Sequence, residues 1–242
     1  MATRRHRLGA VAAAASAALL LVLVLSVLAG CGGSGGDVDA KAVLLASSAK
    51  MKIIKGFHFV YEVHKPGSAK PGSGLEIARM TGDVNSEGNM KAIVDATMSG
   101  VPVSLGFVAY GDTYYIQDPL SQKWTSMAAA DSPVGKLSLG AGTILILDRI
   151  ADVKYEGEES KGGTTCHHIS GMAAAEDAKA IAGLVDTTDP FPTDLWIGVA
   201  DSMVYEVDID GPATHNEVKV EGIWRSIVLS NLDTFVDIEA PQ

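Results

Sequence analysis

The chain has 242 residues, with 19 basic and 29 acidic side chains and a net charge of −10 at pH 7. A chain with this surplus of negative charge repels phosphate backbones, so nucleic acid is excluded as an expected partner. The length suits one domain with a sizeable apolar core.

The first 30 residues have the layout of a bacterial secretion signal. Three arginines between residues 4 and 7 precede a run of Ala, Leu and Val from 8 to 28. The segment Leu28-Ala29-Gly30-Cys31 resembles a lipobox, in which the cysteine receives a diacylglycerol thioether and becomes the mature N-terminus. A transmembrane anchor is the alternative, because about 20 apolar residues can span a bilayer. The glycine-rich residues 32–36 favour the lipobox, since they are typical of a flexible linker.

The sequence therefore predicts a signal peptide at 1–30, a lipidated cysteine with a flexible linker at 31–37, and a single domain at 38–242. We expect the protein to be exported and held at the extracytoplasmic face of the cell membrane by its lipid. Acylation of Cys31 leaves Cys166 alone, so no intramolecular disulfide is expected. Cys166 is predicted to be a packing residue, because a free cysteine behaves as a small hydrophobic side chain.

The domain begins with a predicted helix that is followed by a meander of strands. Asp37 or Asp39 can cap a helix that runs to about Ile54, and residues 57–64 then alternate apolar and polar side chains. Pro and Gly make residues 65–74 a loop. Further strands are predicted at 75–84, 90–98, 101–109 and 114–116, with Trp124 closing the meander. Tight turns between alternating strands favour antiparallel pairing.

The rest of the chain is less regular. Asp131-Ser132-Pro133 is typical of a helix start, and residues 137–150 predict a helix interrupted by Gly140 and Gly142. Another helix is predicted over 175–185. Strands are predicted at 153–158, 164–170, 194–199, 203–209, 218–230 and 235–238. These elements predict an α+β fold in which helices cover the apolar face of an antiparallel sheet.

Several motifs follow one another in an order that is typical of one lipoprotein family. They are Gly111-Asp112-Thr113-Tyr114-Tyr115-Ile116 ahead of Trp124, Asp152-Val153-Lys154-Tyr155-Glu156-Gly157, Thr165-Cys166-His167-His168-Ile169-Ser170-Gly171, Pro192-Thr193-Asp194-Leu195-Trp196-Ile197 and Val236-Asp237-Ile238-Glu239-Ala240-Pro241. With the lipobox and the first helix, they make nearly the whole mature chain resemble the mycobacterial LppX/LprA/LprF/LprG lipoproteins. The resemblance implies a curved antiparallel half-barrel sheet with helices packed on its concave face. It also implies an apolar cavity between these layers that binds the acyl chains of a membrane lipid or glycolipid, without catalysis.

The strand faces between residues 90 and 107 are the candidates for the cavity wall. Their small and flexible apolar side chains leave room for irregular acyl chains and adapt to them. The candidates are Met90, Ala92, Val94, Ala96, Met98, Val101, Val103, Leu105 and Phe107. A closed core, built from small residues because the helices approach closely, is the alternative. The chain departs from the family in its Pro/Gly/Ser loop at 66–74 and in its weakly patterned region at 131–150.

Other reactive side chains are not spaced for catalysis or metal binding. Cys166-His167-His168 suggests a metal site, but successive strand residues point to opposite faces. His58 and His64 lie about 20 Å apart by strand rise, too far for one ion. The glutamates at 156–159 are predicted to be solvated. The chain also has no nucleophile elbow, P-loop or dinucleotide fingerprint, so we expect no catalytic residue, metal or cofactor.

Two functions from different classes fit the sequence. The first is a lipid-anchored carrier that binds an acyl lipid or glycolipid and carries or presents it, working as a monomer with an envelope transporter as a further partner. The second is an envelope scaffold or lipoprotein chaperone that uses the same curved sheet without a lipid ligand. Stoichiometric acyl lipid extracted from the purified protein would favour the first function.

Overall fold

The structure of the chain is a computed structural model. It describes residues 38–65, 75–132, 137–182, 187–211, 213–215, 218–220 and 222–242. Cys31, the linker and the loop predicted at 66–74 lie outside the described residues, so the predictions for them stay predictions. The elements described below belong to one unit, Asp39–Gln242.

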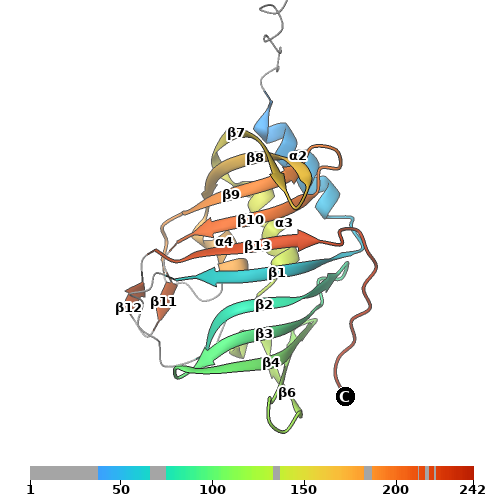
Figure 1. Ribbon diagram of the computed structural model, residues 1–242, viewed down its shortest axis with the longest axis vertical. Helices are drawn as coiled ribbons and strands as arrows, with labels where there is room; N and C mark the ends of the chain where they lie inside the picture. Colours follow the sequence, from blue (N-terminus) through green and yellow to red (C-terminus); the bar gives the residue numbers. More distant parts are fainter. Residues whose placement is uncertain are drawn as a thin grey trace, which may run out of the picture. The chain divides into compact units, whose positions relative to one another are not determined.

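Within the described residues, eleven strands form one open antiparallel sheet (Figure 1). They are β1 (Gly56–His64), β2 (Leu75–Asn85), β3 (Met90–Met98), β4 (Val101–Tyr110), β5 (Thr113–Gln117), β6 (Trp124–Ala128), β7 (Ala151–Lys161), β8 (Thr164–Ala173), β9 (Phe191–Gly198), β10 (Val204–Asp210) and β13 (Trp224–Ser230). Their order across the sheet is β6-β5-β4-β3-β2-β1-β13-β10-β9-β8-β7. Two meanders, β1 to β6 and β7 to β10, are therefore joined by β13, which pairs with both β1 and β10.

Three α-helices lie on one side of this sheet (Figure 1). They are α2 (Ala40–Met51), α3 (Leu139–Arg149) and α4 (Ala175–Ala182), and a short 3-10 helix, η1 (Ala129–Asp131), follows β6. A separate hairpin is formed by β11 (Ala213–His215) and β12 (Val218–Val220). Among the helices that the structure describes, none has the length and apolarity needed to cross a membrane.

The sequence explains where α2 begins. The side chain of Asp39 accepts hydrogen bonds from the backbone N–H groups of Lys41 (3.0 Å) and Ala42 (3.3 Å), as an N-cap residue does. The predicted cap is thus confirmed at Asp39, although the helix ends at Met51 rather than at Ile54.

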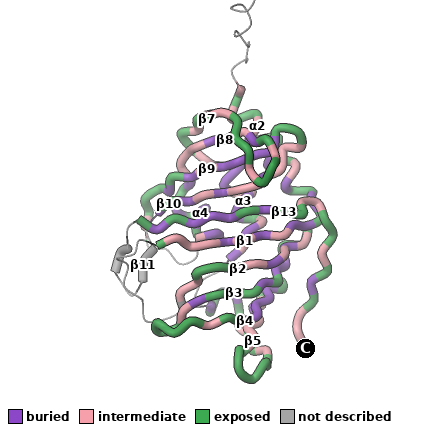
Figure 2. Tube along the Cα trace, viewed as in Figure 1, coloured by how far each residue is buried: buried purple, intermediate pink, exposed green. Residues whose placement is uncertain are grey.

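The core lies between the helices and the face of the sheet that they cover, which we call the inward face. Alternation places Phe57, Phe59 and Tyr61 of β1 on this face, and all three are buried. Figure 2 shows buried segments alternating with exposed ones along the strands. The predicted α+β fold, with an antiparallel sheet covered by helices on one face, is confirmed.

Two predicted strands were wrong in detail. The strand predicted at 218–230 is interrupted: β12 and β13 are separate elements, and Gly222 between them has a φ of +72°, which does not continue a strand. Residues 235–238 form no strand. Figure 1 shows that this segment leaves β13 and passes the ends of neighbouring strands, whereas a strand would have to run along a sheet edge.

Candidate functional site

The nine predicted wall residues share the inward face of β3 and β4. The antiparallel register pairs Met98 with Val101, Ala96 with Val103, Val94 with Leu105 and Ala92 with Phe107, while Met90 pairs with Ala109. Directly opposed residues of a β-ladder project from the same side of the sheet. The structure therefore brings all nine side chains onto one continuous surface, as alternation predicted.

Burial along this surface decreases towards the turn between β3 and β4. Met90, Ala92, Val94, Ala96, Leu105 and Phe107 are buried, and Val103 is half-buried. Met98 and Val101, however, are 50% and 62% exposed. These two residues flank the Ser99-Gly100 turn, where the hairpin projects beyond the described helices. These two side chains are the most exposed of the nine, and their part in a cavity wall stays a prediction.

Burial also differs between the two halves of the sheet. On the inward face of β8, β9, β10 and β13 the apolar side chains are fully buried: Ile169, Leu195, Ile197, Val207, Ile209 and Ile227. On β2 to β6 many inward side chains are buried as well, but Ile77, Val103, Ile116 and Met127 are only partly buried. We call this less covered inward face of β2 to β6 the β2–β6 wall.

Tyr114 fixes the chain that leads into α3 to this wall. Its hydroxyl accepts a hydrogen bond from the backbone N–H of Leu137 (2.7 Å) and donates one to the carbonyl of the same residue (3.0 Å). Its ring packs edge-on against Phe107, with centroids 4.9 Å apart. Burial raises the pKa of the Tyr114 phenol, so it stays neutral. Alternation with Ile116 could have placed Tyr114 on the inward face, but the sequence does not show its contact with Leu137.

Two glycines let α3 lie close to its neighbours. A Cβ atom added at Gly142 would lie 2.8 Å from Cγ1 of Ile181 in α4, and one at Gly140 would lie 3.7 Å from Phe57 and Val84. The glycines that interrupt the predicted helix thus mark its packing contacts. They set how near α3 lies to α4 and to the inward face of the sheet.

A buried cation lies on the inward face near the start of β13. Arg225 of β13 is 2% exposed and donates a hydrogen bond to the carbonyl of Gly211 (3.2 Å). Its guanidinium group also interacts with the hydroxyl of Tyr61, whose pKa is raised by burial and lowered in part by this charge. The sequence does not predict this pair, because an arginine in an alternating strand is expected to face the solvent.

A pocket of about 370 Å³ lies elsewhere, at the ends of β7, β10 and β13. Its lining includes Lys161, Asp201, Met203, Tyr205, Glu206 and Leu232. It does not include any of the nine predicted wall residues. Its position at the ends of β7, β10 and β13 separates it from the apolar face on which acyl chains were expected.

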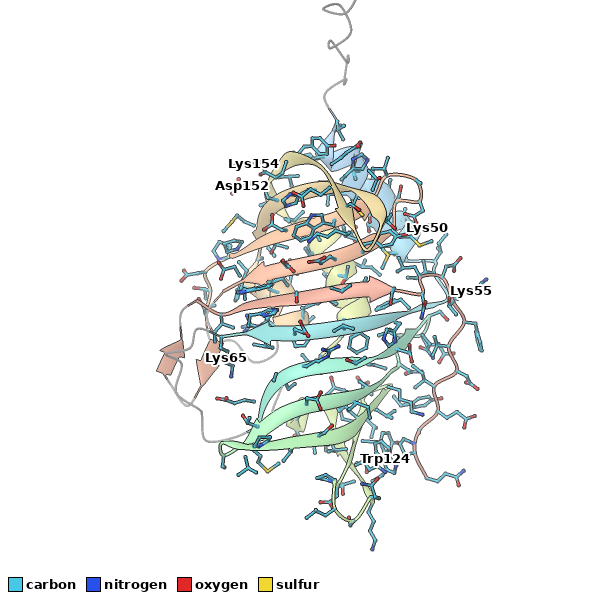
Figure 3. All side chains as sticks on the ribbon, viewed as in Figure 1. Lys50, Lys55, Lys65, Trp124, Asp152 and Lys154 are labelled. Carbon is cyan, nitrogen blue, oxygen red and sulfur yellow. The ribbon has the colours of Figure 1, made fainter. Side chains whose placement is uncertain are left out.

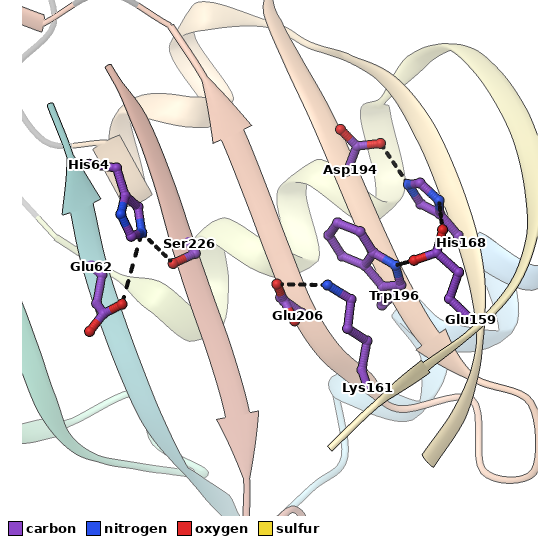
Figure 4. Close-up of polar contacts among 9 residues, drawn as sticks. All are labelled: Glu62, His64, Glu159, Lys161, His168, Asp194, Trp196, Glu206 and Ser226. Atoms are coloured by element: carbon purple, nitrogen blue, oxygen red, sulfur yellow. Dashed lines mark hydrogen bonds and ion pairs between the residues drawn. The ribbon is translucent and has the colours of Figure 1, made fainter. Parts of the chain in front are cut away.

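The opposite, outer face of the sheet carries a polar cluster that joins four strands (Figure 4). His168 lies between Glu159 (3.0 Å) and Asp194 (2.8 Å) and stacks on Trp196, with ring centroids 4.6 Å apart. The indole N–H of Trp196 donates to Glu159 (2.9 Å), and this bond is the main reason why the pKa of Glu159 is lowered. Glu159, predicted to be solvated, is thus engaged with two aromatic rings.

Lys161 completes the outer-face cluster. Its ammonium group lies 3.6 Å from the centre of the Trp196 ring and 3.0 Å from Glu206. Lys161 and His168 therefore each contact a carboxylate. This arrangement stabilises the pairing of β7, β8, β9 and β10, while the neighbouring Asp208 of β10 keeps one carboxylate oxygen without a hydrogen-bond partner among the described residues.

The other predicted residues are placed as alternation requires. Cys166 and His168 share the outer face, whereas His167 faces inward and contacts Tyr155 (3.3 Å). Cys166 is buried and unpaired, and burial raises the pKa of its thiol. Within the described ranges, no three His, Cys, Asp or Glu side chains are grouped to hold a metal ion.

Comparison with known proteins agrees with this architecture. Residues 39–230 match the family model described as LppX_LprAFG lipoprotein. The chain is 30% identical over 173 residues to the lipoarabinomannan carrier protein LprG of Mycobacterium tuberculosis, covering 68% of this chain and 69% of that protein. It is 28% identical over 177 residues to the protein of the same name from Mycobacterium leprae, covering 70% of this chain and 71% of that one.

Two solved structures share the fold. The crystal structure of LprF from Mycobacterium bovis superposes with a TM-score of 0.61 at 19% identity, covering 84% of this chain and 96% of that one. The lipoprotein LppX of Mycobacterium tuberculosis gives a TM-score of 0.58 at 17% identity, covering 84% of this chain and all of that one. The family match spans most of the described unit and the same open sheet recurs in both structures, so the chain belongs to the LppX_LprAFG lipoprotein family.

Proposed function

We propose that this protein is a lipid-anchored carrier at the extracytoplasmic face of the cell membrane. It binds the acyl chains of a lipid or glycolipid against the β2–β6 wall, beneath the chain that leads into α3. The observation that carries this proposal is the difference in burial between the two halves of the inward face. Relatives that are named lipoarabinomannan carriers support an acylated glycolipid as the class of ligand.

The wall suits an acyl chain because it is continuous, apolar and only partly covered. Each methylene group moved from water to such a surface contributes about 0.8 kcal/mol. The other half of the sheet, β8, β9, β10 and β13, has fully buried apolar side chains on its inward face and gives the wall a firm support. Lipid binding then requires only that the segments covering the β2–β6 wall move away from the sheet.

The free-energy cost of an empty cavity predicts how the layers respond to lipid. Two acyl chains need a void of about 1,000 Å³, and at about 24 cal/mol per Å³ a dry, rigid void of that size costs roughly 24 kcal/mol. That exceeds the roughly 5–15 kcal/mol by which a domain is stable. We therefore expect the layers to separate when lipid binds rather than to enclose an empty cavity.

The test is to purify the protein, extract it with organic solvent and measure bound lipid by mass spectrometry. We expect about one acyl lipid per chain, beyond the anchor. Leu105→Trp fills the centre of the wall, and Val103→Trp fills its half-buried end, where the added ring is easier to accommodate in the fold. Both should lower captured lipid severalfold.

Ser104→Trp is the matched control, because Ser104 is exposed on the opposite face of the same strand. Circular dichroism checks that each variant folds. Undiminished lipid in both wall variants would contradict the proposal. Extraction of no lipid, together with a retained partner protein, would instead favour the scaffold or chaperone function.

A further inference from the structure

Helix α2 carries a second apolar face that points away from the core. Its buried face consists of Leu44, Ser47, Ser48 and Met51. The exposed side chains on its other side are Ala42, Leu45, Ala46, Ala49 and Ile53, which we call the α2 stripe. Leu45 and Ile53 are 72% and 74% exposed. At about 100° per residue, the four stripe residues within α2 fall in an arc of about 100° opposite the buried face, and Ile53 follows two residues after the helix ends.

The charges around the stripe differ in sign from those of the whole chain. Residues 40–55 contain four lysines and no acidic residue, although acidic side chains outnumber basic ones by 29 to 19 in the chain. On the helical projection Lys41 and Lys52 border one side of the stripe and Lys50 borders the other. Lys52 is paired with Asp148 (2.8 Å). Figure 3 shows Lys50 and Lys55 extending from the same end of the unit.

The nearest other charges are of both signs, and they include Asp148 of α3 and Asp233, whose carboxylate accepts a hydrogen bond from the backbone N–H of Lys55 (3.0 Å). Asp39 is used as the N-cap of α2. On β7, which α2 contacts, Asp152 and Lys154 are of opposite sign. The surface around the α2 stripe is therefore apolar at its centre and basic at its margins, which is the pattern of a helix that lies in the interface of an anionic membrane.

The length of chain before α2 keeps this helix close to the predicted anchor. Ala40 follows Cys31 by nine residues, which span at most about 30 Å when fully extended. A helix tethered this near to a bilayer meets it at high effective concentration. The apolar stripe and its flanking lysines then add a second membrane contact to the acyl anchor, and two such contacts make membrane attachment stable.

We propose that the α2 stripe docks on the anionic lipid surface of the membrane that holds the anchor. The inference rests on the anchor of the proposed function. It adds that the domain is held against the bilayer by α2 rather than by its linker alone. Leu45 and Ile53 enter the interfacial region, while Lys41, Lys50 and Lys55 face lipid phosphates.

The test uses the full mature lipoprotein reconstituted in vesicles of phosphatidylcholine and phosphatidylglycerol. An environment-sensitive fluorophore is attached to Ala46→Cys, and the control label is attached to Ser104→Cys on the exposed face of β4. Cys166 is buried and so does not react. With spin-labelled lipids in the vesicles, we expect the label at residue 46 to be blue-shifted and quenched at least about threefold more than the control.

The double variant Leu45→Glu/Ile53→Glu should bring quenching at residue 46 down to the control value. Both side chains are exposed, so folding is unaffected. Replacing phosphatidylglycerol by phosphatidylcholine should reduce the quenching as well, because the lysines then lose their partners. The mass of the same sample reports acylation of Cys31 separately, so failure of the anchor and failure of docking are distinguishable.

Equal quenching of the two labels would overturn the proposal, whether or not Cys31 is acylated. A blue shift at residue 46 that depends on protein concentration and needs no vesicles would also overturn it, since a second copy of the chain would then cover the stripe.

Discussion

Asp208 of β10 is the carboxylate whose environment is least favourable to its charge. One of its oxygens is buried and lacks a hydrogen-bond partner among the described residues. The register places it directly opposite Asp194, and Glu206 adds a further negative charge from the same strand. Burial, and then the repulsion from Glu206, raise the pKa of Asp208 to about 7.

This raised pKa predicts a loss of stability on the alkaline side. An unfolded aspartate has a pKa of about 3.9, so between roughly pH 4 and 7 the folded chain holds a proton that the unfolded chain has released. The free energy of unfolding therefore falls as pH rises through this window. Asp208→Asn should remove that fall and raise the free energy of unfolding at pH 8 by about 1–3 kcal/mol.

Urea unfolding at pH 5 and pH 8 measures the effect. Asp95→Asn is the control, because Asp95 is an exposed residue of β3. The burial of Asp208 would be the wrong explanation if both variants changed stability equally at the two pH values. Below pH 4 the free energy of unfolding instead falls as the pH falls, because Asp148 and Glu159 have lowered pKa values and lose favourable contacts when protonated.

At the scale of one element, α3 offers a matched pair of substitutions. Gly→Ala in a helix interior normally stabilises by about 1 kcal/mol. Gly140 is the second residue of α3, so Gly140→Ala should show part of this gain, since its new methyl group meets only ordinary contacts at 3.7 Å. Gly142→Ala should lose at least about 1 kcal/mol instead, because its methyl group would lie 2.8 Å from the fully buried Ile181.

Thermal unfolding followed by circular dichroism compares the two alanine variants. Equal gains would mean that α4 moves freely away from α3. If α4 moves in this way, we would expect the layers to separate first between α3 and α4 when lipid is taken up.

Sequence periodicity predicted which helices and strands form better than it predicted where each of them ends. Alternation located Met90 to Phe107 on one face correctly, because a β-strand repeats every two residues regardless of its surroundings. It could not predict that Met98 and Val101 are exposed, since that depends on how far the helices extend over the turn. The strand predicted at 235–238 failed for a similar reason: pairing requires a free sheet edge, which is a property of topology rather than of composition.

The polar contacts of the molecule could not be predicted from the sequence. Arg225, Tyr61 and Gly211 meet only because β13 inserts beside β1. Glu159 and Trp196 meet only because β7, β8 and β9 are neighbours. No local pattern links residues so far apart in the chain, whereas the motif order that resembles the family carries this information indirectly.

At the scale of the whole molecule, Cys31→Ser tests the anchor. A thioether-linked diacylglycerol supplies two acyl chains, which is what stable membrane attachment requires. We expect the variant to lose the mass of the diacylglycerol and to move from the membrane to the soluble fraction. Cys166→Ala is the control and should stay in the membrane fraction, because Cys166 is buried in the sheet. Unchanged mass and fractionation of Cys31→Ser would contradict lipidation at this residue.

The central position of β13 has a consequence for how the chain is made. β13 is the last sheet strand in chain order, yet it fills the gap between β1 and β10. Until it arrives, both strands present unpaired edges, which are prone to pairing with other chains. A chain that crosses a membrane N-terminus first would therefore remain unfolded during most of its translocation, because the two meanders join only at the end. For the proposed exported lipoprotein, this late pairing keeps the chain able to cross the membrane and makes the molecule depend on rapid completion of its folding.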